Sequence, residues 1–271
     1  MRKEPVIKPL FLERMTLILE DKNDLEKYLE FVKKDSSLSI RVNTIKISVK
    51  NLIERLKNKG WKIGQPFKNY PEILLIESNL EPGELGSSIE HVLGYYYVQD
   101  ISSMMPIIAL NPKENENVLD LCSSPGSKTT QIASNMKNTG SLDANEINLK
   151  RIKILASNLE RCGVTNTIIT RKEGSSLCKE FKEKLAFDKI LIDAPCSGEG
   201  TMKSNLKTGL MWNINTVKNL SGIQKRLIVN SIESLKVNGI LVYSTCTHSP
   251  EENEEVIDYL LKKYPKKLKL E

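Results

Sequence analysis

The sequence lacks the features that would place the protein in a membrane or in an oxidising compartment. No apolar run approaches the roughly 20 residues that span a bilayer, and the N-terminal segment has no apolar stretch followed by a cleavage site, so we expect neither anchor nor signal peptide. The five cysteines are odd in number and widely spaced, no Cys-x-x-Cys is present, and there are two histidines. We therefore expect no disulfide framework, no metal site, and a cytoplasmic protein.

The composition is that of an ordinary folded protein with a modest excess of positive charge. The 271 residues carry a formal net charge of +6, and 39% of them are hydrophobic. This charge suits a polyanion such as RNA, although many proteins without such a partner share it. We expect a small N-terminal α+β domain over 1–85, a linker over 86–116 and a main domain over 117–271.

Helical and extended patterns alternate in the N-terminal domain. Apolar residues at three- and four-residue spacing predict helices over 11–21 and 23–34, the second capped by Asn23-Asp24. Ser48 and Gly60 fit the start and the stop of a further helix. Strands are expected at 37–47, 61–67 and 72–78.

From residue 117 onward, strands alternate with helices. This rhythm is typical of βαβ units, and it predicts an α/β fold with a doubly wound, parallel, Rossmann-like sheet. The expected strands are 117–122, 140–146, 166–171, 187–194 and 239–246, and the expected helices are 127–137, 148–163, 177–185, 213–236 and 250–264.

The chemically unusual residues lie where these strands end. Ligands of such sheets bind beyond the carboxyl ends of the strands. Cys122 to Lys128 and Asp193 to Cys196 follow two of the strands, Glu146 ends a third, and Thr245-Cys246 ends a fourth. This coincidence indicates a site at this edge of the sheet.

The first of these loops, "CSSPGSK", joins a strand to a helix that starts near Ser127. Gly126 permits a tight turn and close approach of a ligand, and the exposed amides at the helix start favour an anionic or strongly polar group. The glycine patterns of a P-loop and of a dinucleotide-binding loop are absent, which excludes both. A plain strand-to-helix turn is the alternative.

Two acids follow at later strand ends. Glu146 stands near the spacing at which an acid of a Rossmann-like unit accepts hydrogen bonds from a ribose diol, which implies a nucleoside-containing cofactor. A helix-capping acid is the alternative for Glu146. Glu173 is a candidate to face an adenine edge, and the alternative is a solvated loop residue.

Two cysteines accompany an acid at neighbouring strand ends. In "LIDAPCSGEG" Asp193 is followed by Cys196, and "LVYSTCTHSPEENEE" carries Cys246. A thiolate is a strong nucleophile, but a free thiol has a pKa of about 8.5 and needs a helper, for which Lys128 is a candidate. Single cysteines are more often inert and buried. From these residues alone, the working thiol is either cysteine, both or neither.

Five segments fit one further pattern: "VLDLCSSPGSKTTQIA", "FDKILIDAPCSGEGT", "LVYSTCTHSPEENEEVI", "IRVNTIKI" and "GYYYVQDISSMMP". Together they resemble the RNA cytosine-5 methyltransferases of the RsmB/Nop2/Sun family. The resemblance covers residues 11–264, and its pairing of Pro-Cys with Thr-Cys at two strand ends is specific. The short form of the chain looks most like the archaeal tRNA enzymes.

The resemblance implies a cofactor and roles for the site residues. Cys246 is implied as the nucleophile that attacks cytosine, Cys196 as the thiol that helps to release the product, and Asp193 as the acid at the ring nitrogen. S-adenosylmethionine is implied as the cofactor, bound by Cys122, Ser123, Ser124, Pro125, Gly126, Ser127, Lys128, Glu146, Arg151, Glu173 and Asp193.

The resemblance also implies the substrate. This is RNA, tRNA in particular, methylated at carbon 5 of cytosine through a covalent cysteine adduct. The alternatives are rRNA, a DNA enzyme in which the Pro-Cys thiol attacks, and a truncated RNA-binding pseudoenzyme. Candidate phosphate contacts in the N-terminal domain include Lys46, Lys50, Arg55 and Lys57, and we expect a monomer.

The chain departs from the family pattern at four places. Ser127 stands at a glycine position, Asp143 at an apolar strand position, and Glu173 where aspartate is usual. Family chains continue for two more strands beyond "KLKLE", so we expect missing strands and an open edge in the sheet.

Overall fold

The computed structural model describes residues 7–19, 21–34, 37–182, 184, 186–205 and 207–270. The chain divides into two compact units. Unit 1 comprises Met1–Ser36, Ala194–Val229 and Ser244–Glu271, and unit 2 comprises Ser37–Asp193 and Asn230–Tyr243. The predicted domain boundaries at 85 and 116 divide the chain into consecutive segments, whereas each of the two units combines segments that are separated in the sequence. The predicted boundaries remain a prediction.

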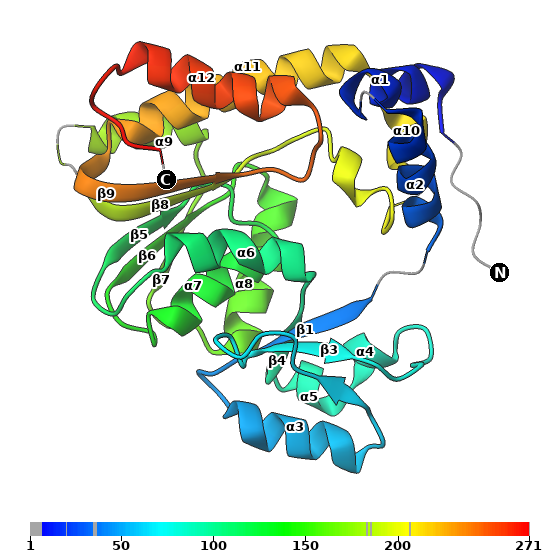
Figure 1. Ribbon diagram of the computed structural model, residues 1–271. Helices are drawn as coiled ribbons and strands as arrows, with labels where there is room; N and C mark the ends of the chain where they lie inside the picture. The colour runs from blue at the N-terminus through cyan, green and yellow to red at the C-terminus, as the bar shows by residue number, and fades with distance from the viewer. Residues whose placement is uncertain are drawn as a thin grey trace. The chain divides into compact units, whose positions relative to one another are not determined.

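A five-stranded sheet in the order β7-β6-β5-β8-β9 is the centre of unit 2 (Figure 1). The pairs β5–β6, β5–β8 and β6–β7 are parallel, with Val118 beside both Leu142 and Lys189. The order and direction confirm the predicted doubly wound, Rossmann-like sheet. The strands are β5 (Asn117–Asp120), β6 (Ser141–Asn145), β7 (Thr167–Thr170), β8 (Phe187–Asp193) and β9 (Leu235–Ser244).

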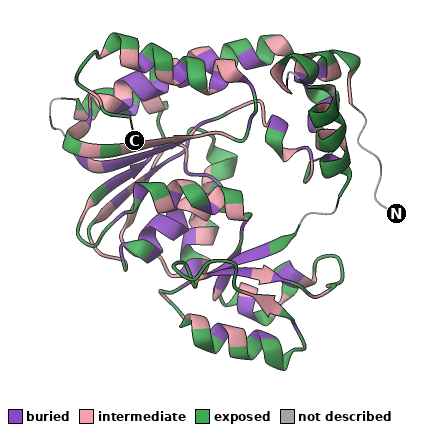
Figure 2. Cartoon of the chain, viewed as in Figure 1, coloured by how far each residue is buried: buried purple, intermediate pink, exposed green. Residues whose placement is uncertain are grey.

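Helices cover both faces of this sheet. The strands β5, β6 and β8 are largely buried (Figure 2), as is expected for parallel strands between helical layers. Val118, Leu142 and Leu191 of the sheet pack against Ile132 of a covering helix. In Figure 1, α6 (Ile101–Leu110), α7 (Ser127–Asn135) and α8 (Leu149–Cys162) lie on one face and α9 (Gly174–Phe181) on the other.

A second, four-stranded sheet in unit 2 has the order β2-β3-β1-β4, and its pairs are antiparallel. An amphipathic helix buries Leu52 and Leu56 against Ile40 and Leu74 of this sheet. The elements are β1 (Leu38–Val42), α3 (Val49–Asn58), β2 (Ile63–Gly64), β3 (Ile73–Ile76), α4 (Glu84–Ser87), α5 (Ile89–Val92) and β4 (Tyr96–Val98).

Unit 1 is helical. Its core packs Phe11 and Met15 against Met202, Trp212 and neighbouring apolar residues, and the rings of Phe11 and Trp212 meet edge to face at 5.5 Å. No helix within the described ranges is both long and apolar enough to cross a membrane. The helices are α1 (Pro9–Leu19), α2 (Lys22–Lys33), η1 (Glu199–Thr201), α10 (Thr208–Met211), α11 (Ile214–Ile232, ending in unit 2), η2 (Pro250–Glu252) and α12 (Glu254–Lys263).

Most predicted elements are confirmed, and several local details were wrong, three of which bear on the fold and the site. The N-cap of α2 is Asp21, which accepts a hydrogen bond from the Asn23 amide, rather than Asn23-Asp24. The long helix ends at Ile232 and not at 236, because the chain enters β9 at Leu235 and passes Asn238 at a φ of 64°. β9 ends at Ser244, so the second cysteine lies in the following loop and not in the strand.

Arg41 of β1 connects the small sheet to the start of α7. Its side chain is buried, and Nη1 donates to the backbone oxygen of Ser127 at 2.7 Å while Nη2 donates to Thr130 Oγ1 at 2.7 Å. Nη1 also bonds Gln99 Oε1. Burial lowers the pKa of Arg41 to about 10, so it is still charged at neutral pH. The guanidinium therefore holds the start of α7 through polar partners.

Arg41→Met should lower the free energy of unfolding by about 2 to 4 kcal/mol, because it leaves several buried acceptors without a donor. The exposed Lys57→Met on α3 is the control and should change stability by no more than about 0.5 kcal/mol. Urea unfolding followed by the fluorescence of Trp61, which lies in the same unit, measures both. Equal effects of the two variants would show that the Arg41 bonds contribute no stability.

Candidate active site

The loop after β5 is held by hydrogen bonds to the neighbouring strand and helix. Ser123 donates from both N and Oγ to the backbone oxygen of Asn145, each at 2.9 Å, and Ser124 Oγ donates to the backbone oxygen of Arg151 at 3.1 Å. Gly126 has a φ of +105°, and a Cβ there would lie 3.1 Å from Leu155 Cδ1. The position therefore requires glycine, and α7 begins at the next residue, as predicted.

Asn145, at the end of β6, was missed in the sequence. Its Nδ2 donates to the backbone oxygens of Leu121 and Lys172, both at 3.1 Å, and its Oδ1 accepts from Thr170 Oγ1 at 3.1 Å and from the Lys172 amide at 3.0 Å. One buried amide thus joins the loops after β5, β6 and β7. The available signal was a polar residue at a strand end, directly before Glu146.

Glu146 is only 4% exposed and lies beside the first loop. Its Oε1 accepts from the Asn148 amide at 2.8 Å, and its Oε2 lies 3.1 Å from Arg151 Nη1. Arg151 Nη2 donates to the backbone oxygen of Ser124 at 2.6 Å, so Arg151 joins Glu146 to that loop. Asn148, not Glu146, is the N-cap of α8. The structure brings Glu146 and Arg151 together, and their roles in cofactor binding remain predictions.

Glu173 is the exposed N-cap of α9. Its Oε2 accepts from the Ser176 amide at 2.8 Å and from Ser176 Oγ at 3.0 Å. These contacts stabilise the helix start. The predicted contact with an adenine remains a prediction.

Asp193, the last residue of β8, pairs with Lys128 of the first turn of α7. Lys128 Nζ lies 2.7 Å from Asp193 Oδ2 and donates to Ser103 Oγ of α6 at 3.1 Å. Both charged side chains are partly screened from water, with exposures of 12% for Lys128 and 35% for Asp193. The end of the sheet therefore presents the Lys128–Asp193 ion pair.

Asp120 and Cys122 lie in a strongly desolvated environment at the end of β5. Burial raises the pKa of Asp120 to about 7, while Thr129 Oγ1 donates to its Oδ2 at 2.7 Å. Burial also raises the pKa of Cys122, and the carboxylates of Asp120, Asp193 and Glu146 add to this shift. Cys122 is therefore a neutral thiol and not a nucleophile.

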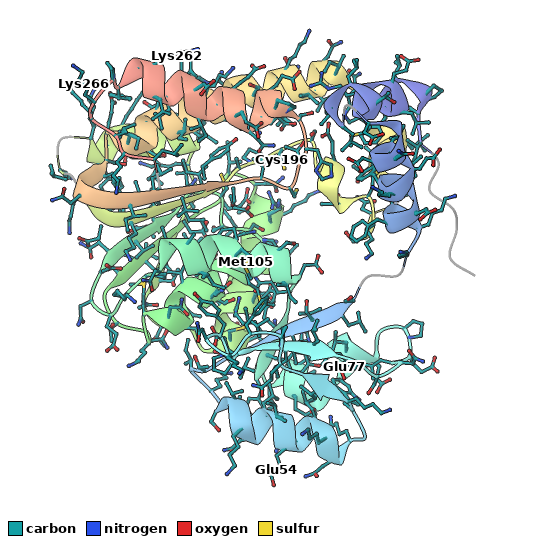
Figure 3. The ribbon with its side chains drawn as sticks, viewed as in Figure 1. Glu54, Glu77, Met105, Cys196, Lys262 and Lys266 are labelled. Atoms are coloured by element: carbon teal, nitrogen blue, oxygen red, sulfur yellow. The ribbon has the colours of Figure 1, made fainter. Side chains whose placement is uncertain are left out.

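Cys196 and Cys246 lie on two loops of unit 1, with their sulfur atoms 3.1 Å apart (Cys196 is labelled in Figure 3). The Cys246 amide donates to Cys196 Sγ at 3.3 Å. Cys246 is exposed and Cys196 is half-buried. The hydrogen bond with Cys246, together with burial, raises the pKa of Cys196, and either sulfur can be the donor in the bond between them.

The predicted site residues thus form two groups. The loop Cys122 to Lys128, Glu146, Arg151, Glu173 and Asp193 all belong to unit 2, whereas Cys196 and Cys246 belong to unit 1. The backbone connects the two groups directly. Asp193 ends the unit 2 segment Ser37–Asp193, Ala194 begins a segment of unit 1, and Cys196 lies two residues after Ala194.

The four basic candidates of the N-terminal region have different surroundings. Lys46 Nζ donates to the backbone oxygens of Leu93 and Arg161, at 3.1 and 2.7 Å. Arg55 lies 3.2 Å from the buried carboxylate of Glu90. Lys46 and Arg55 therefore contribute to the packing of unit 2. The other two candidates, Lys50 and Lys57, are exposed on α3.

The sheet order and the strand-end loops define the S-adenosylmethionine-dependent methyltransferase fold. Residues 107–271 match the family described as 16S rRNA methyltransferase RsmB/F, and residues 7–101 match the N-terminal domain of 16S rRNA methyltransferase RsmF. The chain therefore belongs to the RsmB/F family. The cofactor of this family is S-adenosylmethionine, as predicted.

Two curated relatives share a name. The chain is 42% identical over 253 residues to ribosomal RNA small subunit methyltransferase F of Vibrio campbellii, which is 92% of this chain and 52% of the relative. It is 39% identical over 259 residues to the protein of that name from Psychromonas ingrahamii, covering 94% of this chain and 53% of the relative. The chain spans about half the length of the curated relatives it matches.

Solved structures from Pyrococcus horikoshii are similar along nearly the whole chain. A methyltransferase homolog protein from this organism has a TM-score of 0.76 and 34% identity, covering 94% of this chain and 83% of that chain. NSun6 from the same organism has a TM-score of 0.82 at 23% identity, covering 97% and 87%, and shares the fold.

The pKa of Asp120 predicts a pH-dependent stability. Because folding raises the pKa of Asp120 from its usual 3.8 to about 7, the protonated carboxyl group contributes to the stability of the fold. This contribution to the free energy of unfolding is fully present below pH 3.8 and is lost as the pH rises toward 7. Asp120→Asn cannot ionise. The difference in free energy of unfolding between Asp120→Asn and the wild type should therefore shift in favour of the variant by on the order of 1 kcal/mol per pH unit between about pH 5 and pH 7.

Urea unfolding at several pH values in this range measures the gain. Asp188→Asn is the control, because hydrogen bonds from Lys236 and Asn117 outweigh burial and lower the pKa of Asp188. Its difference from the wild type should stay constant over the same range. A constant difference for Asp120→Asn as well would contradict the raised pKa.

Proposed function

We propose that this chain methylates carbon 5 of cytosine in RNA of the small ribosomal subunit, with S-adenosylmethionine as methyl donor and Cys246 as nucleophile. The observation that carries the proposal is the pair of thiols 3.1 Å apart on the loops after β8 and β9. A structural cysteine needs no second thiol beside it. A cysteine that attacks a base and must later leave it gains from a neighbouring thiol that shares its proton.

The residues of unit 2 fit the cofactor. Glu146 has carboxylate lone pairs beyond those used by Asn148 and Arg151, as hydroxyls of a ribose require. The Gly126 turn brings the backbone close to a ligand, and Asp120 Oδ1 is buried without a hydrogen-bond partner among the described residues. We propose that the loop Cys122 to Lys128, Glu146, Arg151, Glu173 and Asp193 hold S-adenosylmethionine. When bound, it supplies an electrophilic methyl group.

The surroundings of the two thiols support different roles for them. The pKa of Cys196 is raised, and a proton held on Cys196 would stabilise a thiolate on Cys246, whose sulfur lies 3.1 Å away. Cys246 is also the more exposed of the two. We therefore assign attack to Cys246 and assistance in release to Cys196.

The chemistry proceeds on the base. Addition of the Cys246 sulfur to carbon 6 of cytosine breaks the carbon 5–carbon 6 double bond and makes carbon 5 nucleophilic. We propose Asp193, which pairs with Lys128, as the acid at the ring nitrogen, where a proton would stabilise the adduct. Once carbon 5 is methylated, a base removes its proton, the double bond forms again, and Cys246 leaves as thiolate.

The relatives favour rRNA over the tRNA predicted from the sequence. Both curated relatives described above carry the name ribosomal RNA small subunit methyltransferase F. That name supports the rRNA alternative, while the archaeal tRNA resemblance rested on chain length. The position of the target cytidine is outside this proposal.

Adduct formation tests the cysteine assignment. With S-adenosylmethionine and small-subunit rRNA, Cys196→Ala should accumulate a covalent protein–RNA adduct on a denaturing gel, because release is impaired. Cys246→Ala should form no adduct and lose methylation by about 10³-fold or more. Cys178→Ser, a buried thiol bonded to Ser231, is the control and should behave as wild type.

Each other outcome has a definite meaning. A reversed dependence on the two cysteines would make Cys196 the nucleophile. Methylation of tRNA but not of rRNA would restore the tRNA substrate. No adduct and no methylation with either RNA, in wild type and variants alike, would favour the pseudoenzyme.

The exposed lysines of α3 test the RNA-binding surface. Lys50→Glu with Lys57→Glu should weaken rRNA binding and reduce the slope of log affinity against log salt by about 1 to 2, because two phosphate contacts are lost. Lys262→Glu with Lys267→Glu makes the same charge change near the end of the chain (Lys262 is labelled in Figure 3). Filter binding at several salt concentrations measures both. An equal effect of the two pairs would remove α3 from the proposed RNA contact.

A further inference from the structure

Two glutamates lie fully buried in unit 1, close to the loops that carry the two cysteines. Glu199 follows Cys196 by three residues, and Glu252 follows Cys246 by six. Both glutamates are 0% exposed. A buried carboxylate is costly unless its oxygens are hydrogen-bonded, so the partners of such a group indicate what it holds in place.

Glu199 binds three consecutive residues after Cys246. Its Oε2 accepts from Thr247 Oγ1 and from the His248 amide, both at 3.0 Å, and its Oε1 accepts from Ser249 Oγ at 2.7 Å. The side chain of one cysteine loop therefore binds both the backbone and the side chains of the other.

Glu199 is also attached to the core of unit 1. Its Oε1 accepts from Trp212 Nε1 at 2.7 Å, and Trp212 packs edge to face on Phe11. The same two loops touch through the backbone, where the Gly200 amide donates to the Cys246 oxygen at 2.9 Å and a Cβ on Gly200 would lie 3.1 Å from that oxygen. The carboxylate thus links both cysteine loops to a rigid apolar core.

Glu252 and Gln224 hold the residues on either side of Cys196. Gln224 Nε2 donates to the Pro195 oxygen at 2.9 Å and to Glu252 Oε2 at 2.8 Å, and the Ser197 amide donates to Glu252 Oε2 at 3.0 Å. These contacts hold the Cys196 loop to α11 and to η2, which follows Cys246. Ser197 Oγ also lies 2.8 Å from Thr247 Oγ1. Glu199 makes three hydrogen bonds to residues 247–249, so it is the main side-chain contact between the two loops.

We propose that Glu199 is a positioning residue that fixes the two thiols at hydrogen-bond distance by clamping residues 247–249 to the loop after Cys196. The importance of this spacing for catalysis rests on the proposed function, whereas the effect of Glu199 on the distance between the two thiols does not. Reactive groups must be held within about 0.5 Å of the productive geometry, and a displacement of about 1 Å costs roughly a hundredfold in rate. Glu199 supplies this constraint from outside the reacting atoms.

Glu199→Gln tests the proposal, because glutamine keeps the size but turns one accepting oxygen into an NH₂ donor that faces other donors. The direct readout is the rate at which diamide oxidises Cys196 and Cys246 to a disulfide, the diazene being reduced to a hydrazine as two thiols lose their protons and electrons. Mass spectrometry of the linked peptides follows it. The rate should fall roughly tenfold in Glu199→Gln. Thr247→Val, which removes one of the four donors, should show a smaller decrease.

Glu90→Gln is the matched control. Glu90 is 1% exposed and lies in unit 2, bonded by Arg55 and Lys59, so its variant also alters a buried carboxylate without touching the cysteine loops. It should leave the disulfide rate unchanged even if its melting temperature falls. In methylation assays, Glu199→Gln should lower kcat about tenfold with KM for RNA unchanged.

Three results separate this inference from the proposed function. A slower disulfide rate in Glu199→Gln but not in Glu90→Gln supports positioning, even if the wild type methylates no RNA and the proposed function fails. A wild-type disulfide rate in Glu199→Gln overturns the positioning role, even if the wild type is an active methyltransferase. Equal slowing in Glu90→Gln also overturns it, because the effect would then reflect general loosening. If Glu199→Gln does not fold, Thr247→Val gives the same readout.

Discussion

The order of the parallel strands is the constraint on which the other features of unit 2 depend. Because β6, β5 and β8 run side by side in one direction, the loops after them meet at one edge. Glu146 and Asp193 lie at that edge, although 47 residues separate them in the chain. The meeting of the loop 122–128, Glu146 and the Lys128–Asp193 pair is a consequence of this arrangement.

Buried polar groups fix the loops that the sheet brings together. Asn145 joins three loops of unit 2 through backbone partners, and Arg41 attaches the small sheet to the start of α7. Glu199 and Glu252 act similarly on the two cysteine loops of unit 1. In each case an unsatisfied buried group would cost more than its hydrogen bonds contribute, so the loops have little freedom to move apart.

Cys122 and Cys196 show that chemically identical thiols differ in role when their surroundings differ. Cys122 and Cys196 both have raised pKa values, but burial among carboxylates raises that of Cys122, whereas a hydrogen bond to a second thiol is the first cause at Cys196. The former is a neutral thiol. The latter can stabilise a thiolate on Cys246, which is the form that the proposed attack requires.

The sequence alone determined the elements and the neighbourhood of the site. The alternation of strands and helices predicted the parallel sheet, and Ser48, Gly60 and Gly126 were correctly placed at helix ends, because periodicity and capping are local properties. The motifs also selected the loops at the strand ends. The N-cap of α2 was misplaced, because several nearby residues satisfied the same local rule, and the end of α11 was misplaced, because the chain enters β9 at Leu235.

Only the tertiary structure decided which of these residues touch. The distance between Cys196 and Cys246, the attachment of Lys128 to Asp193, and the carbonyl contacts of Lys46 join segments that are distant in the chain. No sequence pattern singled out Glu199 in "CSGEGT", whereas the structure buries it against Trp212 and the residues after Cys246. Such contacts depend on how whole layers pack, and no local pattern of residues encodes them.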